Sequence, residues 1–189
     1  MTGPTVLGLD LSLASTGLAV VADGAVSDVR LVTSPGKQKP PLAFTARRLE
    51  FMAREIEYWI RAEPSDLAVI ESPSFGSKGG SGHERGALWW EVVRVLVEEE
   101  LPIAMVAPST RAKYGTGNGR SDKKEVVAAV RERYPGVEWP AKGKCDDIAD
   151  AVLLAAMGSR LLGYPIEELP AKNLEAMTGM RGPEEVKAA

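Results

Sequence analysis

The chain has 189 residues, of which 44% are hydrophobic, and this suits a single domain with a buried core. No apolar run reaches about eighteen residues and no basic leader precedes the first apolar segment, so we expect neither a membrane span nor a signal peptide. The net charge of −3 is unusual for a protein that binds nucleic acid. Because the chain has one cysteine, Cys145, and one histidine, His83, any metal would be held by carboxylates, and the compartment is expected to be a reducing cytoplasm.

The first 33 residues are expected to form an antiparallel meander. Apolar runs and alternation predict three strands, at 5–11, 18–22 and 25–33. A turn at 12–17 joins the first two strands, and Asp23-Gly24 is a hairpin signal before the third. Asp10 interrupts the otherwise apolar first strand.

A helix at 42–62 and a short apolar strand at 67–71 follow the meander. The strand ends on Glu71, which is the second acid at an apolar boundary. A loop with five glycines, at 72–86, leaves directly from Glu71 and is expected to be mobile and to overhang a site there.

The next helix, at 86–100, is apolar around more of its circumference than a single buried stripe requires. The excess surface could be buried more deeply within the monomer, or it could form a subunit interface. We favour a homodimer through this helix, because tryptophan is enriched in such patches and Trp89 and Trp90 lie here.

A fifth strand is expected at 103–107, followed by a loop or short helix at 108–119 and a helix at 122–134 with Ser121 as its N-cap. Residues 107–133 contain seven basic side chains against three acidic ones, although the whole chain is acidic. Such local asymmetry permits phosphate binding, although an ordinary solvated helix face would look the same.

The last predicted helix runs from 144 to about 162 and is almost wholly apolar after its first turn. Asp147 and Asp150 lie three residues apart and therefore point from one face of this helix, near or within the core. An acid at such a place is most often a cap, and for Asp146 alone we prefer that interpretation. Acids at apolar boundaries in three separate segments instead predict that Asp10, Glu71, Asp147 and Asp150 bind divalent metal.

This order of elements predicts an α/β fold: a mixed five-stranded sheet, with three antiparallel strands and then parallel ones, and helices on both faces. We expect one domain at 1–162 and a C-terminal extension at 163–189 that is peripheral or partly ordered.

The positions of the acids, together with the string from Gly117 to Lys123 (Gly-Asn-Gly-Arg-Ser-Asp-Lys), resemble the RuvC family of Holliday junction resolvases, within the ribonuclease H-like superfamily. The resemblance covers about residues 5 to 160. It implies a homodimeric endonuclease of a bacterial or phage-infected cytoplasm that cuts branched DNA, especially four-way junctions, with two Mg²⁺ ions per site or Mn²⁺ as a substitute. The ends produced would be a 5′-phosphate and a 3′-hydroxyl.

By the same resemblance, the metal-binding and catalytic residues are Asp10, Glu71, Asp147 and Asp150, with Asp146 as the runner-up for Asp147. A second lysine of the family falls at Ala112 here, so one of its two basic neighbours would replace it. The residues expected to contact DNA are Phe75, Arg111, Lys113, Asn118, Arg120 and Lys123.

Two other functions have to be weighed. An actin-like ATPase also begins with a strand, an acid and a glycine turn, but it needs two such domains, for which the chain is too short. A non-catalytic junction-binding protein is the second alternative, and it would have no reason to keep four costly buried acids.

Overall fold

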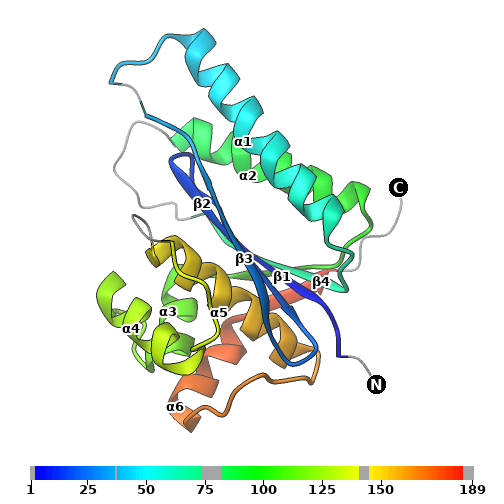
Figure 1. Ribbon diagram of the computed structural model, residues 1–189, viewed down its shortest axis with the longest axis vertical. Helices are drawn as coiled ribbons and strands as arrows, with labels where there is room; N and C mark the ends of the chain where they lie inside the picture. Colours follow the sequence, from blue (N-terminus) through cyan, green and yellow to red (C-terminus); the bar gives the residue numbers. More distant parts are fainter. Residues whose placement is uncertain (1–2, 37, 74–81, 141–144, 185–189) are drawn as a thin grey trace.

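The computed structural model describes residues 3–36, 38–73, 82–140 and 145–184. A six-stranded mixed sheet with the strand order β3-β2-β1-β4-β5-β6 forms its centre (Figure 1). The strands are β1 (Val6–Asp10), β2 (Ser15–Ala22), β3 (Ala25–Thr33), β4 (Leu67–Glu71), β5 (Ile103–Val106) and β6 (Arg181–Glu184). The helices are α1 (Leu42–Ala62), α2 (Gly82–Glu98), α3 (Pro108–Thr116), α4 (Lys123–Arg133), α5 (Cys145–Leu161), α6 (Ala171–Leu174) and the 3-10 helix η1 (Glu175–Gly179).

The strand pairing confirms the predicted α/β class and the mixed sheet. Strands β1, β2 and β3 pair antiparallel, and β1, β4 and β5 pair parallel. The predicted number of five strands is wrong, because β6 pairs antiparallel with β5 and adds an edge strand. Its four residues include glycine and proline and show no alternation of apolar and polar side chains, so no local pattern predicts a strand there.

The segment after α5 packs against the domain before it joins the sheet. Helix α6 and η1 contact α3, and the amide Nδ2 of buried Asn173 donates a hydrogen bond of 2.8 Å to the carbonyl oxygen of Tyr114. The division into a domain at 1–162 and an extension at 163–189 stays a prediction. None of the helices in the described residues is long and apolar enough to cross a membrane.

Several element boundaries differ from the prediction. Strand β2 begins at Ser15, so Ser15 to Gly17 belong to the sheet and not to a turn. Helix α2 begins at Gly82, so the end of the predicted loop is helical. The N-cap of α4 is Asp122 and not Ser121, because Asp122 accepts hydrogen bonds from two backbone N–H groups and forms a capping box with Glu125.

Other local predictions are confirmed. Asp23 and Gly24 both have positive φ, 51° and 80°, as a two-residue hairpin turn requires. The stretch at 108–119 contains helix α3, which ends at Gly117 in the left-handed conformation.

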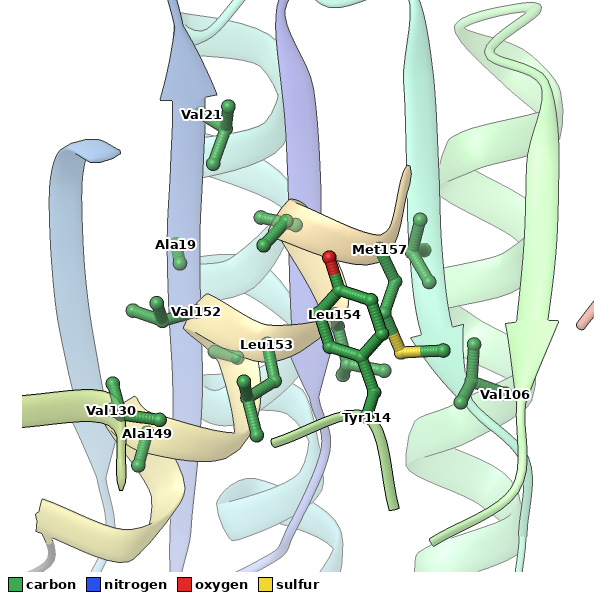
Figure 2. Close-up of a cluster of buried hydrophobic side chains, with 14 of the residues drawn as sticks. Ala19, Val21, Val106, Tyr114, Val130, Ala149, Val152, Leu153, Leu154 and Met157 are labelled. Carbon is green, nitrogen blue, oxygen red and sulfur yellow. The ribbon is translucent and has the colours of Figure 1, made fainter. Parts of the chain in front are cut away.

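The sheet is covered by helices on both faces, as predicted (Figure 1). Side chains alternate along β1, so that Leu7 and Leu9 pack with α1 and α2, whereas Val6 packs with α5. Every residue of α5 from Asp147 to Ser159 is buried. Figure 2 shows the centre of this face, where Val152, Leu153, Leu154 and Met157 of α5 lie among side chains from the sheet, α3 and α4.

Two glycines let α5 lie unusually close to the sheet. A Cβ atom on Gly17 would lie 1.9 Å from the carbonyl oxygen of Asp147, and one on Gly8 would lie 2.1 Å from that of Ala151. Real side chains never approach so closely, so only glycine fits at these two positions. Gly17 pairs with Asp10 in the sheet, so this close approach brings the acidic start of α5 beside Asp10.

We expect Gly17→Ala to lower the free energy of unfolding by about 3 kcal/mol or more, because the added methyl group pushes α5 away from β2. Gly86→Ala is the matched control, since nothing lies within 4 Å of a Cβ there and the residue is inside α2. It should raise stability by roughly 0.5–1 kcal/mol. Urea unfolding of both variants measures this, and equal effects would contradict the close-approach argument.

Candidate active site

Three predicted acids lie at one end of the sheet because of the strand directions. Asp10 is the last residue of β1 and Glu71 is the last residue of β4. These neighbouring strands run parallel, so their carboxyl ends lie side by side at the same end of the sheet. Asp150 reaches the same place from the second turn of α5. The three side chains are mostly buried, with exposed fractions of 13% for Asp10, 19% for Glu71 and 12% for Asp150.

Arg111 of α3 lies among these acids and contacts all three. Its Nη1 donates a short hydrogen bond to Glu71 Oε2 and lies 3.8 Å from Asp10 Oδ1. Its Nη2 is 3.0 Å from Asp150 Oδ2. Only 10% of the Arg111 side chain is exposed. Of the two basic residues that flank Ala112, the structure therefore brings Arg111 to the acids.

Burial raises the pKa of Asp10, Glu71 and Asp150 to about 7 in each case. Loss of water is the largest cause, because the charged carboxylate is poorly solvated there. The acids also raise one another's pKa, with Asp150 acting on Asp10 and Asp10 acting on Glu71. The Arg111 charge lowers all three pKa values and does not outweigh burial.

The other two acids of α5 have different surroundings. Asp147 is buried, with 7% of the residue exposed, and its charge raises the pKa of Asp10. Asp146 forms an ion pair with Lys123, whose side chain is 76% exposed at the start of α4. The Lys123 charge lowers the pKa of Asp10, Glu71 and Asp150, so this lysine lies at the rim of the cluster. Burial favours Asp147 over Asp146 as the fourth acid of the site.

Lys113, Asn118 and Arg120 lie away from the acids. Lys113 forms a 2.7 Å ion pair with Glu175 of η1. Asn118 and Arg120 are exposed, and Asn118 Oδ1 accepts a hydrogen bond of 3.1 Å from the Arg120 backbone N–H. Together they line an open hollow, whose residues are Ser109, Lys113, Gly117, Asn118, Gly119, Arg120, Lys172 and Glu175.

A second open hollow includes Asp146 and, like the first, has three basic side chains in its lining. Its lining is Lys123, Lys124, Val127, Ala128, Arg131, Cys145 and Asp146. Arg131 lies over the ring of Trp139, 4.8 Å from the ring centroid, and this contact holds the arginine at the wall of the hollow. Lys124 and Arg131 were counted in the basic region of the sequence, and the fold brings both of them into one hollow with Lys123 and Asp146.

Phe75 lies outside the described residues, so the prediction for it stays a prediction. Trp89 of α2 contacts the backbone of Glu71, a contact that the sequence did not indicate. Its Nε1 donates a hydrogen bond of 3.1 Å to the backbone oxygen of Glu71 and so ties α2 to the end of β4.

The acids fit a divalent cation by their chemistry. They offer only carboxylate oxygens, which Mg²⁺ and Mn²⁺ prefer, and their summed charge exceeds that of Arg111, the one cation buried in the described part of the chain. Among the described residues, however, no three acidic, histidine or cysteine side chains already converge closely enough to hold one ion. The carboxylates are instead spread around the guanidinium of Arg111.

Comparisons with known proteins identify similar sequences and folds. The family profile described as "Crossover junction endodeoxyribonuclease RuvC" matches residues 6–174. A protein of that name from Corynebacterium diphtheriae is 31% identical over 153 residues, which cover 79% of this chain and 90% of the relative.

Solved structures share the fold at lower identity. "Thermus thermophilus RuvC structure" has a TM-score of 0.63 at 18% identity and covers 87% of this chain and 98% of its own. "T. thermophilus RuvC in complex with Holliday junction substrate" has a TM-score of 0.63 at 19% identity, with coverages of 80% and 90%.

We expect Asp10→Asn to stabilise the metal-free protein at pH 8 by roughly 4 kcal/mol relative to wild type, and by less than half of that at pH 5. Because folding raises the pKa of Asp10 from 3.8 to about 7, its contribution to stability is fully present below about pH 4 and is lost as the pH rises through 7. Asparagine does not titrate there, and Arg111 keeps Glu71 and Asp150 as partners. Chemical unfolding at the two pH values measures the difference.

Asp23→Asn is the control for this experiment, because it makes the same chemical change in an exposed turn. Its effect should stay within about 0.5 kcal/mol. A difference between wild type and Asp10→Asn that fails to grow with pH would contradict the view that the Asp10 charge is costly.

Proposed function

The chain belongs to the RuvC family of crossover junction endodeoxyribonucleases, and we therefore propose that it cuts phosphodiester bonds in branched DNA, above all in four-way junctions, with the help of divalent metal ions. We further propose that the ions are Mg²⁺, with Mn²⁺ as a substitute, and that two bind per site. The setting is the cytoplasm of a bacterial or phage-infected cell.

The observation that carries this proposal is the grouping of Asp10, Glu71 and Asp150, from β1, β4 and α5, around Arg111. A purely structural ion pair would need one acid for one arginine. Buried acids beyond that number destabilise the fold unless further positive charge binds among them. A site for metal ions and a phosphate explains why the chain tolerates this surplus.

We propose that Asp10, Glu71, Asp147 and Asp150 hold the ions, with Asp146 less suited because it pairs with Lys123 at the rim. Bound ions would supply an activated water and relieve charge at the phosphate and the leaving oxygen. Lys123 is exposed and its charge acts on Glu71, so we propose that its ammonium group contacts the scissile phosphate. Arg111 stands in for the family's second lysine. The products would be a 5′-phosphate and a 3′-hydroxyl.

The two basic hollows suit the DNA arms that lead to the site. The hollow that includes Asp146 contributes Lys123, Lys124 and Arg131, and the other contributes Lys113, Arg120 and Lys172. Phosphate contacts of this kind provide affinity and position without reading sequence. They explain how a chain with a net charge of −3 can bind DNA. We propose that Asn118 shapes the turn that presents Arg120, and that Phe75 stacks on a base.

We propose that α2 pairs two copies of the chain. Most of its apolar side chains are used within the monomer, since Leu88, Val92, Val95 and Leu96 are buried. Trp90 is 66% exposed and Val97 is 45% exposed, and seven residues separate them, so they share one face of the helix. This narrower face is the part of the helix that a partner could cover.

The deciding experiment is cleavage of an end-labelled four-way junction and of a linear duplex with the same sequences. We expect cleavage of the junction alone, only when Mg²⁺ or Mn²⁺ is present. Asp10→Asn should bind the junction and cut it roughly a hundredfold or more slowly, because the charge that holds the ions is lost. Ligation of the nicked product would verify the 5′-phosphate and 3′-hydroxyl ends.

Other outcomes of this assay decide between the alternatives. If wild type and Asp10→Asn bind the junction equally and neither cuts it, the protein is a junction-binding protein without nuclease activity. Hydrolysis of ATP without DNA cleavage would instead support the actin-like ATPase.

For the dimer, we expect wild type to have the mass of two chains by light scattering at micromolar concentration. Trp90→Arg should give the mass of one chain, because dimerisation would then bury a charge at the centre of an apolar contact, away from water. Tyr164→Arg is the control, since Tyr164 is also a large exposed side chain, 51% exposed, and follows α5 instead of lying on α2. A monomeric wild type would overturn the dimer proposal.

A further inference from the structure

Arg111 is the only buried lysine or arginine among the described residues. It lies in the first turns of α3, where its backbone N–H donates a 3.0 Å hydrogen bond to the carbonyl oxygen of Ala107. Helix α3 starts directly after β5, so its beginning is fixed to the sheet. The backbone of Arg111 is therefore rigid, and its long side chain is the part that can move.

The guanidinium of Arg111 is the positive charge that lies among the carboxylates of the acid cluster. It reaches carboxylates from three different elements, through Nη1 to Glu71 and Asp10 and through Nη2 to Asp150. These carboxylates would otherwise repel one another, as their mutual effects on pKa show. The third nitrogen of the group, Nε, is buried and has no hydrogen-bond partner among the described residues. Its hydrogen-bonding capacity is therefore only partly used, which argues against a contact built for stability alone.

We propose that Arg111 is an exchangeable internal counter-ion: in the metal-free protein it holds Asp10, Glu71 and Asp150 together, and metal binding displaces its guanidinium toward the DNA phosphate. This proposal rests on the metal-dependent site proposed above and deepens it. It makes Arg111 a competitor of the metal ions and, once displaced, a ligand of the substrate.

Charge balance supports the exchange. Four ionised carboxylates match two divalent ions, so no negative charge remains to hold Arg111 once both ions are bound. A phosphodiester carries one negative charge and two oxygens that a guanidinium can contact in parallel. The displaced group would therefore find its next partner in the substrate, a short distance away.

The first test measures Mn²⁺ binding to the full chain by electron paramagnetic resonance, without DNA. Arg111→Met removes the charge and keeps a long side chain. It should bind Mn²⁺ roughly tenfold more tightly than wild type, since the ion no longer competes with the guanidinium. Lys113→Met is the matched control, because Lys113 lies on the same helix and pairs with Glu175 instead; its Mn²⁺ affinity should equal that of wild type. Equal or weaker Mn²⁺ binding by a folded Arg111→Met protein would overturn the proposal.

A second measurement needs no folded Arg111→Met protein. In wild type, the Arg111 Nε–H signal in nitrogen-15 NMR, assigned by its loss in Arg111→Lys, should exchange slowly with water when metal is absent. Titration with Mg²⁺ should speed this exchange roughly tenfold or more, as the side chain leaves its buried position. An unchanged rate at saturating Mg²⁺ would overturn the proposal. A protein that shows both metal effects and yet cuts no junction would contradict the nuclease function and still support the exchange of Arg111.

Discussion

The site depends on an imbalance of buried charge, because more carboxylates than cations share the end of the sheet. Asp10, Glu71, Asp147 and Asp150 come from two strands and one helix, and Arg111 is the single cation buried among them in the described residues. Burial raises the pKa of three of these acids toward neutrality, so the metal-free site carries charge only at a cost. A cation of sufficient charge that binds there relieves this cost, and the relief adds to its binding free energy. The unfavourable charge of the metal-free site therefore contributes to its affinity for metal ions.

The imbalance can exist only because the backbone brings the acids close together. Parallel pairing of β1 and β4 places Asp10 and Glu71 side by side at the ends of neighbouring strands. Helix α5 reaches the same point because Gly8 and Gly17 leave no Cβ atoms between it and the sheet. The apolar remainder of α5 is buried against both β1 and β2 (Figure 2), so hydrophobic packing holds the helix there against the repulsion at its acidic start. The core and the site are thus mechanically coupled through one helix.

Much of this arrangement could be predicted from the sequence, and the failures have physical reasons. Acids that follow apolar runs mark the carboxyl ends of buried strands, and this pattern pointed to Asp10 and Glu71. The apolar pattern after Asp147 predicted a buried helix. The edge strand β6 carries no alternation, and its pairing with β5 is decided by tertiary contacts that a local pattern does not encode. Gly17 resembles a turn residue in the sequence, whereas in the structure it is a strand residue selected by the approach of a distant carbonyl group. Neither pattern nor composition could reveal that an arginine lies among the acids.

The different roles of Arg111 and Lys113 follow from the geometry of α3. Two residues apart on an α-helix, their side chains point to nearly opposite sides, so only one of them can face the acids. Two contacts of buried Tyr114 fix the orientation of α3 about its own axis. The Tyr114 hydroxyl group donates a hydrogen bond to Glu167, and the Asn173 amide donates one to the Tyr114 carbonyl oxygen. Both of these contacts come from the segment after α5, and the same segment supplies Glu175 to Lys113. The C-terminal segment therefore does more than cover one end of the molecule: by fixing the rotation of α3, it determines which cation enters the acid cluster.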